Sequence, residues 1–143
     1  MEDRLVFGSR YRVGVEQVDL EHQKLFELAS HIYDSLALDV IVPMHEIRSA
    51  IDELIECTEA HFAHEEVLMA DSAYPNLEDH RAIHAELISR IKSFETQMEK
   101  TGQMTPVDVY DFLCSWLGDH ILTNDMRFGE FVSRQSGPDA VRA

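Results

Sequence analysis

The sequence predicts an all-α protein: an up-down-up-down antiparallel four-helix bundle with an N-terminal extended arm and a short C-terminal helix or tail. Apolar residues recur at steps of three and four over four long stretches, and short segments containing Pro or Gly separate the stretches. No β-hairpin signal or internal repeat competes with this pattern. Short connections favour antiparallel neighbours, so the four apolar stripes are expected to meet in one core.

The first predicted helix covers residues 18–36 and the second covers residues 44–70, with Pro43 between them. Each has one stripe of residues at the helical period, and such a stripe faces the core of a bundle. The stripe of the first helix is Val18, His22, Leu25, Ala29, Ile32 and Leu36, and that of the second is Ile47, Ile51, Leu54, Thr58, His61, Glu65 and Leu68.

The third helix is expected to begin after Asn76, a suitable N-cap, and to stop at Thr101-Gly102. The fourth begins at Pro106 with Thr105 as its cap, because a proline at the first helical position gives up no helical hydrogen bond. The inward stripes are Leu77, His80, His84, Leu87, Ile91, Phe94 and Met98 in the third helix, and Val109, Leu113, Trp116 and His120 in the fourth.

Size and charge limit what this chain can bind. At 143 residues and 45% hydrophobic content it is expected to form one globular domain over residues 1–132, followed by a flexible C-terminal tail at 133–143. The net charge of -15 argues against nucleic acid and anionic membranes, because both are polyanions. No apolar run approaches the ~20 residues that span a bilayer, and the N-terminus lacks a secretory signal. Cys57 and Cys114 suggest reduced thiols in a cytoplasmic protein. The protein is also expected to be a monomer.

Side chains that bind transition metals lie on these inward stripes. His61 and Glu65 are four residues apart, and so are His80 and His84. This spacing puts both side chains of a pair on one helix face, with Cβ atoms about 5–6 Å apart. Imidazole and carboxylate together suit iron, manganese or zinc better than calcium or magnesium. Buried without partners, such groups would cost about 1–3 kcal/mol each or more, so the sequence predicts a pair of metal ions. The candidate ligands are His22, His61, Glu65, His80, His84, His120 and Asp125.

Asp125 does not follow the helical spacing of the other candidates. It comes five residues after His120, which places it about 140° away on an ideal helix. Thr123-Asn124 between them suggests that the helix loosens there and lets Asp125 turn inward.

Other polar residues near these positions are not expected to bind metal. His31 and His45 should face water. His64 lies about 60° round the helix from the preceding candidate histidine, so it is expected at the surface, with a supporting contact to the site as the alternative. Glu66 lies roughly 140° from that histidine and is not expected to be a ligand. Cys57 is predicted to be a small buried thiol that points inward.

The order and spacing of the candidate ligands resemble the hemerythrins, in particular the single-domain bacterial ones, over roughly residues 7–132. Two departures fall outside the ligands: Phe7 stands where these proteins usually have tryptophan, and Leu87 where phenylalanine is common. The matching phrases are Val18-Asp19-Leu20-Glu21-His22, His61-Phe62 with Glu65-Glu66 and Leu68-Met69, Tyr74-Pro75, and Trp116-Leu117 with His120-Ile121.

The resemblance implies a non-haem di-iron centre that binds O2 reversibly, with two iron ions cycling between Fe2+ and Fe3+ and joined by an oxo or hydroxo bridge. One iron would have a free position, where NO or small anions such as azide would also bind. By resemblance, His80, His84 and His120 hold one iron, His22 and His61 hold the other, and Glu65 and Asp125 bridge them. Residues Trp116 and Leu117 resemble those that line and gate the O2 pocket, to which Phe62 and Ile121 contribute.

On this basis the protein is expected to carry, store or deliver O2 and not to be an enzyme. An oxygen-consuming enzyme would be the recipient. The alternatives are an O2-sensing domain cut from a larger signalling protein, or a di-iron protein that handles NO or repairs iron centres. Oxidases and iron-storage bundles use Glu-x-x-His motifs, which this chain lacks.

Overall fold

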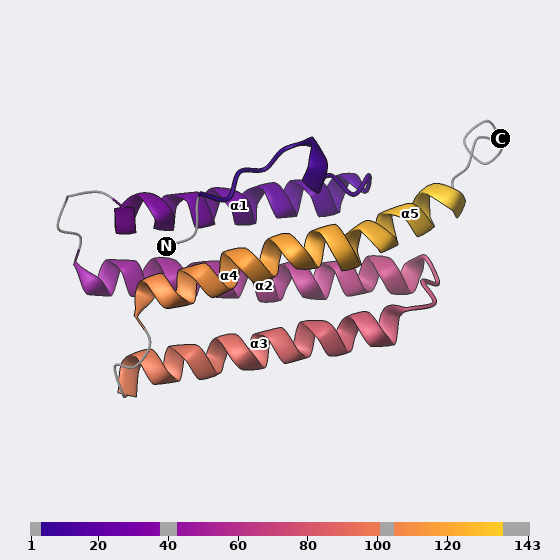
Figure 1. Cartoon of the computed structure of the whole chain (residues 1–143). Helices are drawn as coiled ribbons and strands as arrows, with labels where there is room; N and C mark the ends of the chain where they lie inside the picture. The colour runs from indigo at the N-terminus through magenta and orange to yellow at the C-terminus, as the bar shows by residue number, and fades with distance from the viewer. Residues whose placement is uncertain (1–3, 38–42, 101–104, 136–143) are drawn as a thin grey trace.

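The computed structural model describes residues 4–37, 43–100 and 105–135, and in this part of the chain four long helices lie side by side. They are α1 (Glu16–Ala37), α2 (Met44–Asp71), α3 (Leu77–Lys100) and α4 (Pro106–His120), the last continued by α5 (Met126–Gln135). Successive helices run in opposite directions, with α1 packed on α2 and α4, and α3 packed on the same two helices (Figure 1). The predicted antiparallel four-helix bundle is confirmed.

The cap of α4 is the one that the sequence predicts. Thr105 Oγ1 accepts a hydrogen bond from the backbone N–H of Asp108 at 3.2 Å, and Asp108 Oδ2 accepts one from the N–H of Thr105 at 2.9 Å, with Pro106 at the start of the helix. The predicted stop at Thr101-Gly102 lies outside the described residues. At the other end α5 continues to Gln135, three residues past the expected domain boundary, and the rest of the predicted tail is not described.

The core follows the predicted stripes. Each long helix contributes side chains that are at most 1% exposed, among them Leu25, Ile51, Leu87 and Val109. The prediction for Cys57 is wrong: this thiol is half-buried and lines a shallow surface pocket between α1 and α2. It sits about 100° round the helix from its buried neighbour Thr58, which places it at the edge of the inward face. None of the described helices combines the length and apolar character that crossing a membrane requires.

A π-helical turn, η2 (Ile121–Asp125), joins α4 to α5. The N–H of Met126 donates to the carbonyl of Ile121, five residues back, so this turn holds one more residue than an α-helical turn. The wider turn brings Asp125 round to the face that carries His120, where it is fully buried. The helix therefore loosens where the sequence predicts, and the loosening takes the form of a π turn.

The N-terminal arm, residues 4–15, lies back along α1 and includes the short 3-10 turn η1 (Ser9–Tyr11) (Figure 1). Tyr11 packs edge-on against Phe26, with ring centroids 4.9 Å apart. Asp19 of α1 accepts hydrogen bonds from the backbone N–H groups of Val13 at 2.7 Å and Gly14 at 3.1 Å. Gly14 has a φ of 89°, which favours glycine, so the arm turns into α1 at a position that Asp19 holds.

Gly129 of α5 lets the arm approach the composite helix closely. A Cβ at this position would lie 1.9 Å from the carbonyl oxygen of Val13, a contact that only movement of the backbone could relieve. We expect Gly129→Ala to lower the free energy of unfolding by about 1–3 kcal/mol, measured by chemical denaturation. Gly118→Ala is the matched control, because its Cβ would make only ordinary contacts of 3.6 Å or more. Equal stability of the two variants would contradict this packing.

Candidate metal centre

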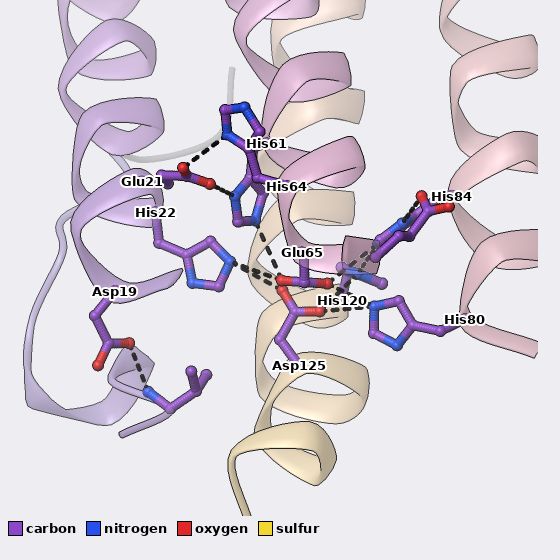
Figure 2. Close-up of polar contacts among 12 residues, drawn as sticks. Asp19, Glu21, His22, His61, His64, Glu65, His80, His84, His120 and Asp125 are labelled. Carbon is purple, nitrogen blue, oxygen red and sulfur yellow. Dashed lines mark hydrogen bonds and ion pairs between the residues drawn. The ribbon is translucent and has the colours of Figure 1, made fainter. Parts of the chain in front are cut away.

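All seven candidate ligands meet in the middle of the bundle. Each side chain is almost fully buried, with exposures between 0% and 5%. The carboxylates of Glu65 and Asp125 lie at the centre, with His22 on one side and His80 and His120 on the other (Figure 2). The four long helices and the π turn together supply the set: His22 from α1, His61 and Glu65 from α2, His80 and His84 from α3, His120 from α4 and Asp125 from η2.

The seven residues form two overlapping groups, in each of which one ligand atom per residue lies within 4.8 Å of the others. Both groups contain Glu65 and Asp125. The five-residue group adds His80, His84 and His120, and the four-residue group adds His22 and His61. This is the division between two metal positions that the family resemblance implies.

Within the cluster, the imidazole nitrogens lie close to the carboxylate oxygens of Glu65 and Asp125. His80 Nε2 lies 2.7 Å from Glu65 Oε1 and 3.0 Å from Asp125 Oδ1. His22 Nε2 lies 2.9 Å from Asp125 Oδ2, and His61 Nε2 lies 3.3 Å from Glu65 Oε2. Each carboxylate therefore has one oxygen near each group of imidazoles, as a bridging ligand requires.

Several of these buried atoms make no hydrogen bond within the described chain, which is costly unless another partner is present. In addition, His84 Nε2 lies 3.1 Å from His120 Nε2, so two imidazole nitrogens face each other. A metal ion would give both nitrogens and the carboxylate oxygens a partner, and a mixed nitrogen and oxygen set fits iron. The atoms without partners are His22 Nδ1 and Nε2, His61 Nε2, Glu65 Oε2 and both carboxylate oxygens of Asp125.

The carboxylates of the cluster stay ionised when no metal is bound. Burial and the nearby charge of Asp125 raise the pKa of Glu65, but the close imidazoles of His61, His80 and His84 outweigh both and lower it to about 2. Burial also raises the pKa of Asp125, and the surrounding histidines hold that pKa well below its usual range. Two negative charges therefore lie at the centre of the site, ready for cations.

Two of the histidines bind protons tightly in the same metal-free state. Burial lowers the pKa of His61, but Glu21 and Glu65 outweigh it and raise that pKa to about 9. Burial likewise lowers the pKa of His80, and Asp125 and Glu65 raise it to about 9. At neutral pH protons thus occupy positions that a metal ion would take.

Metal uptake is therefore expected to release protons. Because the raised pKa values keep His61 and His80 protonated at pH 7, loading with Fe2+ or Zn2+ should release about two protons per chain. The release should shrink as the pH rises past about 9, where the metal-free imidazoles are already neutral. Calorimetry in buffers of different ionisation enthalpy measures it. Loading at pH 7 with no net proton release would contradict the raised pKa values.

Two carboxylates outside the cluster contact ligand imidazoles, and helix-face reasoning does not find them. Glu21 of α1 accepts a hydrogen bond from His61 Nδ1 at 2.7 Å, and Glu66 of α2 accepts one from His84 Nδ1 at 3.0 Å. Glu66 is not in either ligand group, as predicted. His64 is exposed, as expected, and its Nδ1 lies 2.9 Å from Glu21 Oε2. The one available sequence signal was adjacency, because Glu21 and Glu66 each neighbour a candidate ligand in the chain.

The exposed positions of the other histidines agree with the sequence. His31 and His45 are both exposed. Neither belongs to a group of residues able to hold a metal ion within the described chain.

Aromatic rings cover the imidazoles of the five-residue group. Phe62 stacks on His84 with ring centroids 3.7 Å apart and planes 3° from parallel. Trp116 stacks on His120 at 4.5 Å and 11°. Each contact covers one flat face of a ligand and restrains its ring plane.

A small apolar cavity lies inside the bundle, lined by residues of all four long helices but by none of the seven candidate ligands. Its volume of about 10 Å³ is about that of one water-sized molecule. Of the four residues predicted to form the O2 pocket, Trp116 and Leu117 line this cavity, whereas Phe62 and Ile121 are buried elsewhere and are not among its lining residues. The remaining lining residues are Ala29, Leu54, Thr58, Leu87, Leu113 and Cys114.

Buried imidazoles and carboxylates in two overlapping groups define a class: four-helix bundles whose interior side chains are able to hold metal ions. The family model described as the hemerythrin HHE cation binding domain matches residues 13–132 of this chain. The chain belongs to the hemerythrin family.

Individual relatives agree with this assignment. A bacteriohemerythrin of Clostridium acetobutylicum is 31% identical over 125 residues, covering 86% of this chain and 97% of that protein. A bacteriohemerythrin of Pseudomonas aeruginosa is 27% identical over 90% of this chain and 81% of its own length. A myohemerythrin of Riftia pachyptila is 28% identical over 86% of this chain and 89% of its own length.

Proposed function

We propose that this protein binds O2 reversibly at a non-haem di-iron centre, for the carriage, storage or delivery of oxygen. The observation that carries the proposal is the pair of overlapping ligand groups, which share two carboxylates but differ in their number of imidazoles. Five residues surround one metal position and four surround the other. The position with fewer protein ligands is the one with room for an exogenous molecule.

In this proposal His80, His84 and His120 hold one iron, His22 and His61 hold the other, and Glu65 and Asp125 bridge the two. An iron pair held by these residues would supply the two electrons that O2 binding requires and would recover them when O2 leaves. The buried, ionised carboxylates offset the charge of the two cations. The imidazoles complete the coordination as neutral ligands once their protons have left.

The residues around the centre exclude water. Leu117 and Trp116 line a cavity whose other lining side chains are mostly apolar, and such a cavity stays dry while admitting a small apolar gas. Exclusion of water favours reversible binding, because water or anions that reached the metal would displace the bound oxygen as peroxide, which carries both electrons away and would leave oxidised iron. Phe62 covers His84, and Ile121 fills the π turn with no exposed surface.

The proposal extends to partners. Azide, other small anions and NO are expected to compete with O2 for the same position. We propose a monomer that acts in the cytoplasm, carries out no catalytic turnover of its own and delivers O2 to an oxygen-consuming enzyme.

Iron content and reversibility test the proposal. Protein produced with ample iron should contain about two iron atoms per chain and no haem. After anaerobic reduction, adding O2 should change the visible spectrum, and removing O2 should restore it over repeated cycles. A single zinc ion per chain, or O2 that is consumed without return, would contradict the proposal, and the second result would favour an NO-handling or repair role.

A further inference from the structure

Two carboxylates outside the ligand set each reach one metal-binding imidazole. Glu21 of α1 crosses to α2, where its Oε1 accepts a hydrogen bond from His61 Nδ1 at 2.7 Å. Glu66 of α2 crosses to α3, where its Oε2 accepts one from His84 Nδ1 at 3.0 Å. Both carboxylates are mostly buried, with 24% and 23% of the side chain exposed. Each therefore joins a ligand to the adjacent helix.

The second oxygen of each carboxylate contacts a donor at the surface. Glu21 Oε2 lies 2.9 Å from His64 Nδ1, so Glu21 contacts both His61 and His64 (Figure 2). Glu66 Oε1 lies 3.3 Å from Arg81 Nε. Each carboxylate is thus held at both oxygens, by a ligand on the inside and by His64 or Arg81 on the outside.

These contacts determine how the two imidazoles can bind metal. A neutral imidazole that donates its Nδ1–H to a carboxylate has its lone pair on Nε2, the nitrogen that faces the cluster and that can bind metal once any proton there has left. In agreement, His61 Nε2 is buried without a hydrogen bond, and His84 Nε2 faces His120. The carboxylate also fixes the ring plane and makes the imidazole a stronger ligand.

We propose that Glu21 and Glu66 are positioning residues, each of which serves one metal position of the pair. His61 belongs only to the four-residue group and His84 only to the five-residue group, so the two effects are separate. Glu21, with His64 behind it, supports the position where an exogenous ligand is expected. Glu66, which Arg81 contacts from the surface, supports the metal position of the five-residue group. This inference rests on the proposed metal pair and adds residues that neither ligand group contains.

Metal retention tests the proposal without any O2 chemistry. The protein is loaded with Co2+, and the metal is then withdrawn by a chelator of known affinity while the visible absorption of Co2+ is followed. In Glu21→Ala one of the two ions should be held about 10–100-fold less tightly, with the other within threefold of wild type. In Glu66→Ala the other ion should instead be the one that is held less tightly. Glu59→Ala is the control and should retain both ions, because Glu59 of α2 pairs with Lys92 at 3.6 Å and belongs to neither ligand group.

A His22→Ala background identifies which position is affected. This change removes a ligand that only the four-residue group contains, so the Co2+ that remains belongs to the five-residue group. In this background Glu66→Ala should lower the affinity for the remaining ion about 10–100-fold. Glu21→Ala should leave that affinity within threefold of the value for His22→Ala alone.

Two further variants separate positioning from general stability. In Glu21→Gln the amide oxygen can still accept from His61 Nδ1, so most of the lost affinity should return relative to Glu21→Ala. Adding His64→Ala to Glu21→Ala should cause no further loss, because His64 acts through Glu21.

The outcomes separate this inference from the proposed metal pair. Equal weakening of both ions in each variant, or retention of both within threefold, would overturn the assignment of Glu21 and Glu66. A wild-type chain that holds no more than one Co2+ would instead refute the metal pair itself.

Discussion

Replacing either shared carboxylate should reduce the iron content from about two atoms per chain to one or fewer. Glu65 and Asp125 are the only residues found in both ligand groups of the described chain, so Glu65→Ala or Asp125→Ala removes an oxygen ligand from each position at once. The change also leaves several buried imidazoles without a counter-charge, and uncompensated buried charge costs several kcal/mol. Metal analysis of iron-loaded protein, together with the visible spectrum, measures the loss.

His31→Ala is the matched control for these two variants. His31 lies on α1, as His22 does, but its side chain is exposed and belongs to neither ligand group. Its iron content and O2 binding should equal those of wild type. If this surface change were as damaging as loss of Glu65 or Asp125, the assignment of the inward helix faces would be wrong.

Shortening Leu117 should accelerate both the release of O2 and the autoxidation of iron. Leu117 is 5% exposed and lines the apolar cavity with Trp116, one turn before His120. Leu117→Ala removes three carbons from this wall, which widens the cavity and admits water. Iron content should stay at the wild-type level, because Leu117 offers no ligand atom. Stopped-flow dissociation and autoxidation rates test this directly.

Leu113→Ala is the control that distinguishes loss of the Leu117 side chain near His120 from a general loss of stability. Leu113 is equally buried and lines the same cavity, but lies one helical turn further from His120. Both variants are expected to lose about 2–5 kcal/mol of stability if the cavity does not collapse. Only Leu117→Ala should show the large increase in autoxidation rate. Equal rates in Leu117→Ala and wild type would place the route for O2 elsewhere.

The bundle could be predicted because the features that encode it are local. Apolar stripes at the helical period, Pro106 behind Thr105, and short connections each act within a few residues of the chain. The same period places His61 and Glu65 on one face, and His80 and His84 on another, so their convergence follows once the helices pack. The irregular position of Asp125 could also be predicted, because Asp125 comes five residues after His120 and can face the same side only if the helix loosens between them.

Other features of the site depend on how neighbouring helices are rotated against one another. Glu21 and Glu66 lie off the inward stripe of their own helices, so periodicity assigns them to the surface, yet each meets an imidazole of the next helix. Cys57 shows the reverse, because it was expected inside and lies at the edge where α1 and α2 meet. The apolar cavity likewise depends on which side chains of four helices fail to fill the space between them.

The sequence by itself determined the four helices, their buried faces and the seven side chains on them, because helix period and ligand spacing are properties of a single segment. Tertiary structure decided the rest. It made the loosened helix a π turn, gave Glu65 and Asp125 to both ligand groups, and placed Glu21 and Glu66 behind His61 and His84. These outcomes require contacts between residues far apart in the chain, whose geometry depends on how all the helices pack together.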